Sequence, residues 1–406
     1  MHVLEFAGEP PRHARKHASA LPCSRTPHNG RSGNLAHLAK LCRACSPPVP
    51  ILLHGAAGLA AVAGLLPAPA WAHVKWFAPY DVAEAPVPIR GVMTTHFLLV
   101  LTGFALLIFG GFLLDRLVAR SGITGLERRE EAEERVLRAG VGAFFMALFT
   151  MGGIILTPEL HTEANWPAWL QFGIAISMVS ARTCILGGLG IVVLYVYGIA
   201  LYGVFHLSDY PMFLGIAAYM ALTSTASERL RSLRMPILYA TVCGSLMWVS
   251  VEKWAYPQWT FPLLEAHPYL TLGILPADFM LVAGFVEFAL AFYILTGLGL
   301  LRLGIVGLGL IFLSAILDFG KLDAIGHLPT IACLIAMFLH GPTSLHGWLH
   351  DARRGLLAEA GKAGLSIATA LCILFGTYYG LQHAEFRNGA GAYRHAALTP
   401  PTHVQL

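Results

Sequence analysis

The feature that most constrains this sequence is a succession of apolar runs of about 20 residues, separated by short polar loops. A helix of that length crosses about 30 Å of hydrocarbon. Charged side chains make up only 12% of the chain, about half of what a soluble globular protein carries. The sequence therefore excludes a soluble enzyme, a disordered scaffold and a nucleic-acid-binding protein. It predicts an all-α, polytopic transmembrane helical bundle whose first partner is the lipid bilayer.

The N-terminal region is typical of a segment that is removed after export. Residues 1–47 carry seven Lys or Arg and two acids without hydrophobic periodicity, so we expect a disordered leader. Residues 48–72 contain the apolar stretch Ile51–Leu66 and end in Ala-Trp-Ala, which is the pattern of a secretory signal peptide. Cleavage after Ala72 leaves His73 as the first mature residue. The alternative is an uncleaved first membrane helix.

The rest of the chain divides into ten expected spans. A Pro-rich extracytoplasmic arm (73–92) precedes a first membrane helix group (93–234) and a second group (235–341). An amphipathic cytoplasmic segment (342–362), a last span (363–383) and an extracytoplasmic tail (384–406) follow. The expected spans are Met93–Leu117, Ala139–Leu156, Trp166–Ala181, Thr183–Phe205, Met212–Ala226, Met235–Trp254, Ala277–Leu301, Leu303–Gly320, Leu328–His340 and Ala363–Leu381.

The distribution of basic residues predicts the orientation. With the mature N-terminus outside and all ten spans crossing, the basic clusters fall in the inner loops, the densest being residues 229–234. The outer loops then hold mainly acids such as Glu159, Glu163 and Asp209. This satisfies the positive-inside rule, and it requires the short segment Trp166–Ala181 to cross. We therefore expect a multi-pass protein of a bacterial inner membrane with both mature termini outside.

A weak internal repeat accompanies this pattern. A shift of 114 residues, the difference between 323 and 209, places Leu189–Val192 on Leu303–Val306 and Asp209 on Asp323. If the repeat is a duplication, spans two to five and six to nine form two parallel four-helix units. Chance matches between apolar sequences are common, and both interpretations stay open.

Ionisable side chains at membrane depth are the main functional signal, because such groups are costly in hydrocarbon. Glu287 follows Pro276 by eleven residues, which is about 16 Å along a helix and near the middle of the bilayer. The candidate catalytic residues are Glu287, Lys253 at the end of span six, and Asp318, Lys321 and Asp323 near the outer face. They suit a proton-linked step. The alternative is a charge network that only locks the bundle.

Histidines supply the candidate metal ligands. The candidates, all expected at the outer face, are His73, His96, His161, His206 and His327. Imidazoles near carboxylates suit copper, zinc or haem iron, and an N-terminal His73 also offers its α-amine. The spacing of these residues matches no metal-binding motif, so the sequence does not fix a cofactor.

Three stretches of spans six to nine carry a resemblance to a known family. They are Trp248–Pro257, which contains Lys253, Ala283–Glu287, which contains a Gly-x-x-Glu pattern, and Asp318–Leu328. Through them residues 235–341 resemble the DoxX-like family of bacterial four-helix membrane proteins, over about 100 of the 406 residues. That family includes the membrane subunit of thiosulfate:quinone oxidoreductase and subunits of other membrane oxidoreductase complexes. The resemblance implies a quinone-linked function together with other membrane or periplasmic subunits.

Three functional hypotheses remain open. The first is a membrane subunit of a quinone-linked redox complex in which Glu287 and Lys253 handle a proton, with quinone a better-fitting cofactor than haem or copper. The second is a metal or small-solute transport protein that is loaded at the outer histidines. The third is a non-catalytic structural membrane partner. The sequence leaves open whether the chain is an enzyme.

Overall fold

The structure is a computed structural model that describes residues 74–78, 80–120, 130–346 and 355–386. All of them belong to the second of the two units into which the chain divides, Met1–Val62 and Ala63–Leu406. The described residues form helices and no named strand, and their one β contact is an isolated bridge between Ile154 and His161. The all-helical prediction is therefore confirmed. The expected leader, the signal peptide and His73 lie outside the described residues.

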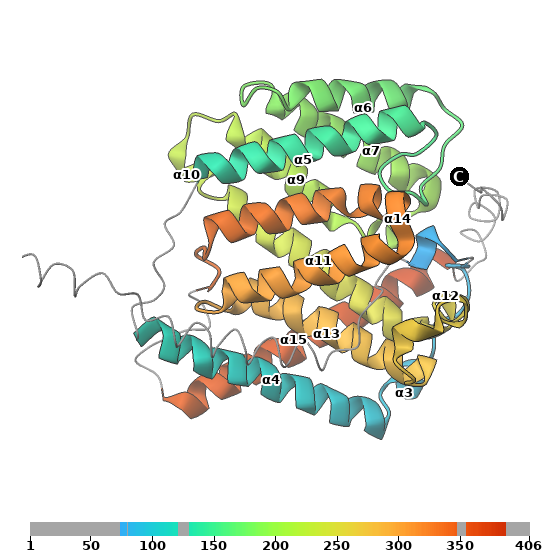
Figure 1. Ribbon diagram of the computed structural model, residues 1–406, viewed down its shortest axis with the longest axis vertical. Helices are drawn as coiled ribbons and strands as arrows, with labels where there is room; N and C mark the ends of the chain where they lie inside the picture. The colour runs from blue at the N-terminus through green and yellow to red at the C-terminus, as the bar shows by residue number, and fades with distance from the viewer. Residues whose placement is uncertain (1–73, 79, 121–129, 347–354, 387–406) are drawn as a thin grey trace, which may run out of the picture. The chain divides into compact units, whose positions relative to one another are not determined.

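The helices follow one another along the chain with short connections (Figure 1). In chain order they are η1 (Val74–Trp76), α3 (Ile89–Val92), α4 (Thr95–Arg120), α5 (Glu130–Met151), α6 (Trp166–Ser177), α7 (Cys184–Tyr202), α8 (Val204–Leu207), α9 (Pro211–Thr223), α10 (Glu228–Arg231), α11 (Arg234–Ala255), η2 (Pro257–Trp259), α12 (Phe261–Ala266), η3 (Pro268–Thr271), α13 (Pro276–Thr296), α14 (Leu301–His340) and α15 (Leu356–Phe386).

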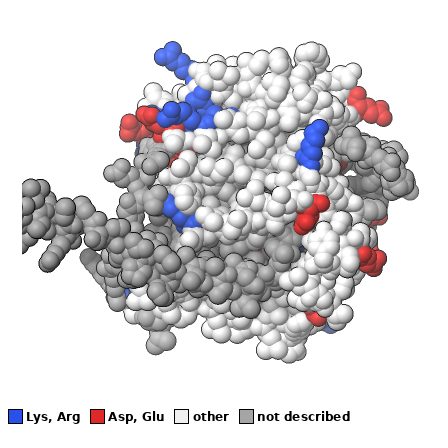
Figure 2. All heavy atoms as spheres, in the orientation of Figure 1, with Lys and Arg blue, Asp and Glu red and all other residues white. Residues whose placement is uncertain are grey.

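Several of these helices have the length and composition of membrane spans. Within the described ranges six stretches are long and apolar enough to cross: Thr95–Val118, Cys184–Tyr202, Glu228–Ala255, Pro276–Thr296, Leu301–His340 and Ala358–Phe386. Large apolar side chains such as Leu99 of α4 and Val196 of α7 are exposed, which suits contact with lipid. Figure 2 shows one face on which Lys and Arg gather toward the α10 end and a broad middle band is almost free of charge. These features are those of a multi-pass membrane protein.

Helix α14 consists of two antiparallel stretches. Gly320 has φ 75° and ψ −145°, a conformation that glycine adopts readily and other residues do not. The Arg302 side chain donates a hydrogen bond from Nε to the Phe338 carbonyl oxygen at 2.8 Å, so the two ends of α14 lie side by side (Figure 1). A straight helix of 40 residues would be about 60 Å long, twice the thickness of the hydrocarbon layer. The reversal falls where the sequence predicts a boundary between two spans.

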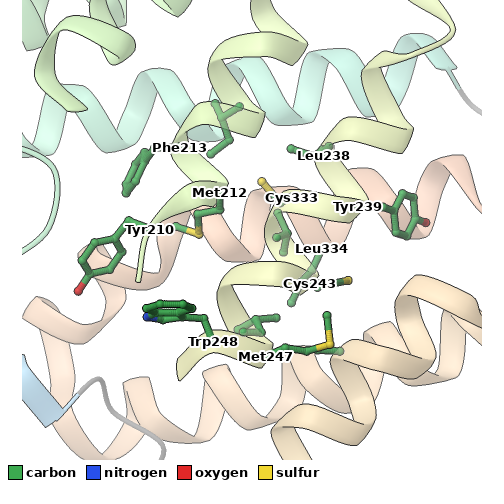
Figure 3. Packing of buried hydrophobic residues seen from close by; sticks show 14 of the residues in the cluster. Tyr210, Met212, Phe213, Leu238, Tyr239, Cys243, Met247, Trp248, Cys333 and Leu334 are labelled. Atoms are coloured by element: carbon green, nitrogen blue, oxygen red, sulfur yellow. The ribbon is translucent and has the colours of Figure 1, made fainter. Parts of the chain in front are cut away.

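The core lies where α9, α11 and α14 meet. Figure 3 shows buried side chains along this interface, among them Phe213 of α9, Leu238 and Trp248 of α11, and Cys333 and Leu334 of α14. Small residues allow the backbones to approach. An ideal Cβ on Gly140 of α5 would lie 2.4 Å from Cβ of Ala332 on α14, and one on Gly215 of α9 would lie 1.7 Å from Oγ1 of Thr241 on α11. The close pairs α5–α14 and α9–α11 therefore join the first helix group to the second.

Charged side chains tie the bundle at the two ends of α11. At the first end, which we call the Arg234 end, Glu133 of α5 contacts His340 of α14 at 2.5 Å and Arg234 at 3.6 Å. Arg234 also contacts Glu134 at 3.2 Å. The opposite end, which we call the Lys75 end, carries Glu252 near the end of α11. It holds the cavity described next.

Candidate functional site

A cavity of about 80 Å³ lies among α9, α11, α13 and α14 at the Lys75 end. Since one buried water needs about 10–15 Å³ by this kind of measure, the space suits about five to eight waters or one small ligand. Aromatic rings line it, among them those of Phe279 and Phe312. Its polar lining includes Thr157, Asp209, Glu252, Lys253, Glu287 and His327. An apolar pocket with a few convergent polar groups is the usual form of a ligand site.

Lys253 and Glu287 form an ion pair at this cavity. The Lys253 Nζ donates a hydrogen bond to Oε2 of Glu287 at 2.6 Å, and the two side chains are 17% and 6% exposed. Lys253 lies on α11 and Glu287 on α13. The neighbouring Gly284 allows the close approach of these helices, because an ideal Cβ there would lie 2.3 Å from Nε1 of Trp254. The acid that the sequence places at mid-bilayer depth thus faces a cation inside the bundle.

A second charged group adjoins the same cavity and includes a residue that sequence reasoning missed. Lys75 of η1 places its Nζ 2.5 Å from Oδ2 of Asp209 and 2.6 Å from Oε2 of Glu252, with all three side chains at most 5% exposed. The indole of Trp248 donates a hydrogen bond to the other oxygen of Asp209 at 2.9 Å. Two signals could have pointed here: Asp209 is the repeat equivalent of Asp323, and Glu252 directly precedes Lys253.

Burial and charge pairing have opposite effects on the pKa of Lys75 and on the pKa of Asp209. Burial alone lowers the pKa of Lys75, but the carboxylates of Asp209 and Glu252 outweigh it and raise that pKa above its ordinary 10.5. Burial raises the pKa of Asp209 from 3.8 to about 7, against the opposing effect of Lys75. One ammonium facing two carboxylates leaves an excess negative charge, which a proton on Asp209 removes. Burial and the surplus carboxylate thus both favour a proton on Asp209.

Glu159 and His206 form a third polar group beside Asp209. The Tyr210 hydroxyl donates a hydrogen bond to Oε1 of Glu159, and Nε2 of His206 lies 3.7 Å from the same oxygen. The Tyr80 hydroxyl lies 3.4 Å from that imidazole nitrogen. Burial lowers the pKa of His206, although Glu159 opposes the shift. Burial therefore favours the neutral form of this imidazole.

His327 lines the cavity and is oriented from behind by Asp323. The Nδ1 of His327 lies 3.0 Å from Oδ2 of Asp323, a fully buried side chain one helical turn earlier on α14. Rings of Trp76 and Phe312 each lie 4.8 Å from the imidazole, centroid to centroid. A carboxylate on one ring nitrogen fixes which face of the histidine meets the cavity.

The five candidate catalytic residues divide into two sets. Lys253 and Glu287 line the cavity, and Asp323 supports His327 from behind. Asp318 and Lys321 flank the reversal of α14 and are exposed, and the Tyr269 hydroxyl lies 3.5 Å from Asp318. The sequence places all five residues among the polar positions of spans six to nine, but the fold brings only three of them to the cavity or directly behind it.

The candidate metal ligands do not converge. His206 and His327 are buried in different groups, while His161 is partly buried in the loop before α6. His96 is exposed and lies 3.4 Å from Asp278, and His73 precedes the described residues. In the described part of the chain no group of three or more His, Cys, Asp or Glu side chains is arranged to hold a metal ion.

Comparison with family models, with curated proteins and with solved structures gives no match for this chain. Functional assignment therefore depends on the geometry of the cavity. That geometry offers two ammonium groups, three carboxylates and a carboxylate-supported imidazole within or beside one small buried space. Such groups can donate, accept and store protons.

Proposed function

We propose that the protein is a membrane subunit of a quinone-linked redox complex and that the cavity handles the proton that accompanies reduction of the quinone. The observation that carries this proposal is the Lys253–Glu287 pair, an acid and a base joined at 2.6 Å on the wall of a buried cavity. A carbonyl oxygen that gains electrons takes up protons, and a positioned acid within hydrogen-bond reach supplies them. In this proposal Lys253 donates a proton to the reduced quinone oxygen, Glu287 takes up a proton from water and passes it to Lys253, and the electrons come from another subunit.

The rest of the lining offers groups that would contact a ring with carbonyl oxygens. Thr157 is 1% exposed, and its hydroxyl has no hydrogen-bond partner among the described residues, so it can donate to a ligand oxygen. His327 offers a second donor. Phe279 and Phe312 supply apolar faces. A buried hydroxyl without a partner costs free energy, and a ligand carbonyl would satisfy it.

We also propose the ten-span topology, with the mature N-terminus outside a bacterial inner membrane. The reversal of α14 at Gly320 supports two spans within residues 301–340. Apolar α9 and the α5 and α6 helices supply the remaining three. The basic residues gather toward the α10 end (Figure 2), which the positive-inside rule would place in the cytoplasm.

Cysteine labelling tests this topology. Glu265 and Arg229 are both exposed and lie on opposite sides of the proposed membrane. In an otherwise cysteine-free chain, Glu265→Cys is expected to react with an impermeant maleimide in intact spheroplasts. Arg229→Cys is expected to react only after lysis. The same side for both positions contradicts the topology.

The two-repeat organisation and the DoxX-like unit at residues 235–341 belong to the same proposal. Helices α11 and α13 and the two stretches of α14 make up the second unit, and α5, α6, α7 and α9 the first. The exchanged packing of α5 on α14 and of α9 on α11 is what a parallel duplication would produce. Asp209 and Asp323 are both buried near the start of the last helix of their unit, which adds a matched pair of side chains.

Quinone binding tests the function. The purified protein in nanodiscs is heated with and without a short-chain ubiquinone or menaquinone. We expect one of the two quinones to raise the Tm of the wild type and of the exposed-site control Glu265→Gln. The same quinone should leave the Tm of Thr157→Val and of Glu287→Gln unchanged. If neither quinone shifts Tm and no redox subunit co-purifies, the redox proposal is wrong.

A further inference from the structure

We propose that Asp209 and Glu252, together with the ring of Trp259, form a binding site for a primary ammonium group, and that Lys75 of the N-terminal arm fills it as a tethered ligand. The inference goes beyond the proton chemistry of Lys253 and Glu287, because it assigns a ligand class to a different part of the cavity wall.

The surroundings of the Lys75 ammonium are those of a recognition site. Two carboxylate oxygens lie 2.5 and 2.6 Å from Nζ, on Asp209 and Glu252. The ring centroids of Trp259 and Tyr80 lie 5.4 and 5.6 Å away, within the range of cation–π attraction. Carboxylates beside aromatic faces favour a compact, hydrogen-bonding organic cation.

Most of this site is built by residues outside the arm. Asp209 is held by the Trp248 indole at 2.9 Å, and Glu252 projects from α11. Trp259 of η2 stacks on Tyr256 at 4.0 Å between ring centroids, with an interplanar angle of 11°. Lys75 itself is separated from Asp209 by 134 positions in sequence. Residues outside the arm thus supply both carboxylates and an aromatic face, and a distant segment contributes the cation.

The charge balance of the adjoining cavity also favours a cation. Asp209, Glu252 and Glu287 contribute three carboxylates to its lining. Lys253 lines it as well, and Lys75 contacts two of the carboxylates from the side. With these five groups ionised, one negative charge is in excess. The buried hydroxyl of Thr157, without a partner among the described residues, offers a donor or acceptor to the remainder of a ligand.

Removing only the cation should be strongly unfavourable, because two carboxylates would then face each other in a buried space. A soluble ammonium that enters the vacated position should restore the loss, as any ligand that binds only the folded state does. Lys75→Ala deletes the atoms from Cγ to Nζ, which correspond to n-propylammonium. Lys75→Met deletes the charge but keeps a stem of similar length, so it leaves no room for that ion.

Thermal unfolding of the purified full chain in nanodiscs tests the site. We expect Lys75→Ala to lower Tm by roughly 5–10 °C and n-propylammonium chloride to restore it in a dose-dependent manner. Propyltrimethylammonium, which has no N–H donor, should not restore it. The Lys75→Met variant, the double variant Lys75→Ala/Asp209→Asn and the wild type should show no amine-dependent rise. Arg229→Ala, which removes an exposed basic side chain of α10, should behave as the wild type.

Each outcome bears on the proposal. Three outcomes overturn it: equal stabilisation of Lys75→Ala by the two ammonium ions, an amine-dependent rise in the Tm of Lys75→Met, and a Lys75→Ala protein as stable as the wild type. If Lys75→Ala can be purified only with n-propylammonium present, loss of monodispersity on dialysis replaces the Tm shift and supports the site. If that variant fails to fold even with the amine while Lys75→Met folds, the site does not accept a free ammonium and the proposal is wrong.

Discussion

Lys253 and Glu287 meet across the interface of α11 and α13, with Nζ and Oε2 2.6 Å apart. Since both side chains are largely buried, removing one partner leaves the other charge uncompensated. We expect Glu287→Leu to lower the free energy of unfolding by about 3 kcal/mol and Lys253→Met/Glu287→Leu to recover most of that loss, because apolar replacements of a buried pair are often neutral. Reversible unfolding in mixed micelles measures both.

The exposed-site variant Glu265→Gln is the matched control for this cycle and should leave the stability within about 0.5 kcal/mol of the wild type. A double variant as unstable as Glu287→Leu alone would show that the pair does not account for the loss.

Asp209 predicts a pH dependence of stability. Its pKa is raised by burial from 3.8 to about 7 in the folded chain, so between these values the folded state holds a proton that the unfolded state has released. Stability should therefore fall as the pH rises from about 4 to about 7 and then level off. Lys75, whose pKa is raised, stays charged throughout this window and loses its contribution only in strong alkali.

The measurement is Tm from about pH 5 to about pH 8 for the wild type and for Asp209→Asn. The charged groups around this carboxyl are Lys75, Glu252 and Glu159, and all three are retained in the variant. Asparagine should remove most of the slope. An unchanged slope in Asp209→Asn would assign the titration to one of the neighbours.

Gly326 of α14 packs directly against the Trp76 ring of the N-terminal arm. An ideal Cβ at this position would lie 2.2 Å from the Trp76 ring, so Gly326→Ala should displace that ring from the cavity. We expect stronger acrylamide quenching of tryptophan fluorescence in Gly326→Ala, and no such increase when the same change is made in a Trp76→Phe background. Gly309→Ala on the same helix, where no atom lies within 4 Å, should resemble the wild type.

Gly320 should resist substitution for a backbone reason. Its φ of 75° with ψ −145° is a conformation that costs other residues about 1–3 kcal/mol. We expect Gly320→Ala to reduce the free energy of unfolding by that amount, while Gly309→Ala in the helical part of α14 is neutral or stabilising by up to about 1 kcal/mol. Equal effects at the two glycines would mean that the reversal places no demand on residue 320.

The helices follow from local patterns in the sequence, which also names Lys253 and Glu287 as candidates without establishing that they form a pair. Apolar length indicates α4 within a few residues, the expected span Met93–Leu117 against the observed Thr95–Arg120. A carboxylate at mid-helix needs a partner inside the bundle, and the end of span six is within reach. The position of Gly320 at an expected boundary is likewise a local signal.

The Lys75 group could not be predicted in this way, because it depends on contacts between distant segments. Glu252 and Lys253 are adjacent in sequence, yet successive residues of a helix point about 100° apart, so one contacts Lys75 and the other Glu287. Exposed Asp318 and buried Asp323 lie on the two sides of the reversal at Gly320, so helical spacing does not relate the directions of their side chains. The histidines are predicted to lie on one side of the membrane, but residues on the same side can be far apart, so this prediction does not identify a shared site.

The two ends of α11 differ in which elements would have to move to open the bundle there. At the Arg234 end the charged contacts join α5, α11 and α14, so a passage there requires whole helices to separate. At the Lys75 end the contact partner is a three-residue helix, η1, whose lysine and tryptophan cover the carboxylates and His327. We therefore expect that displacement of this one short segment would uncover the carboxylates and His327 without any separation of the long helices.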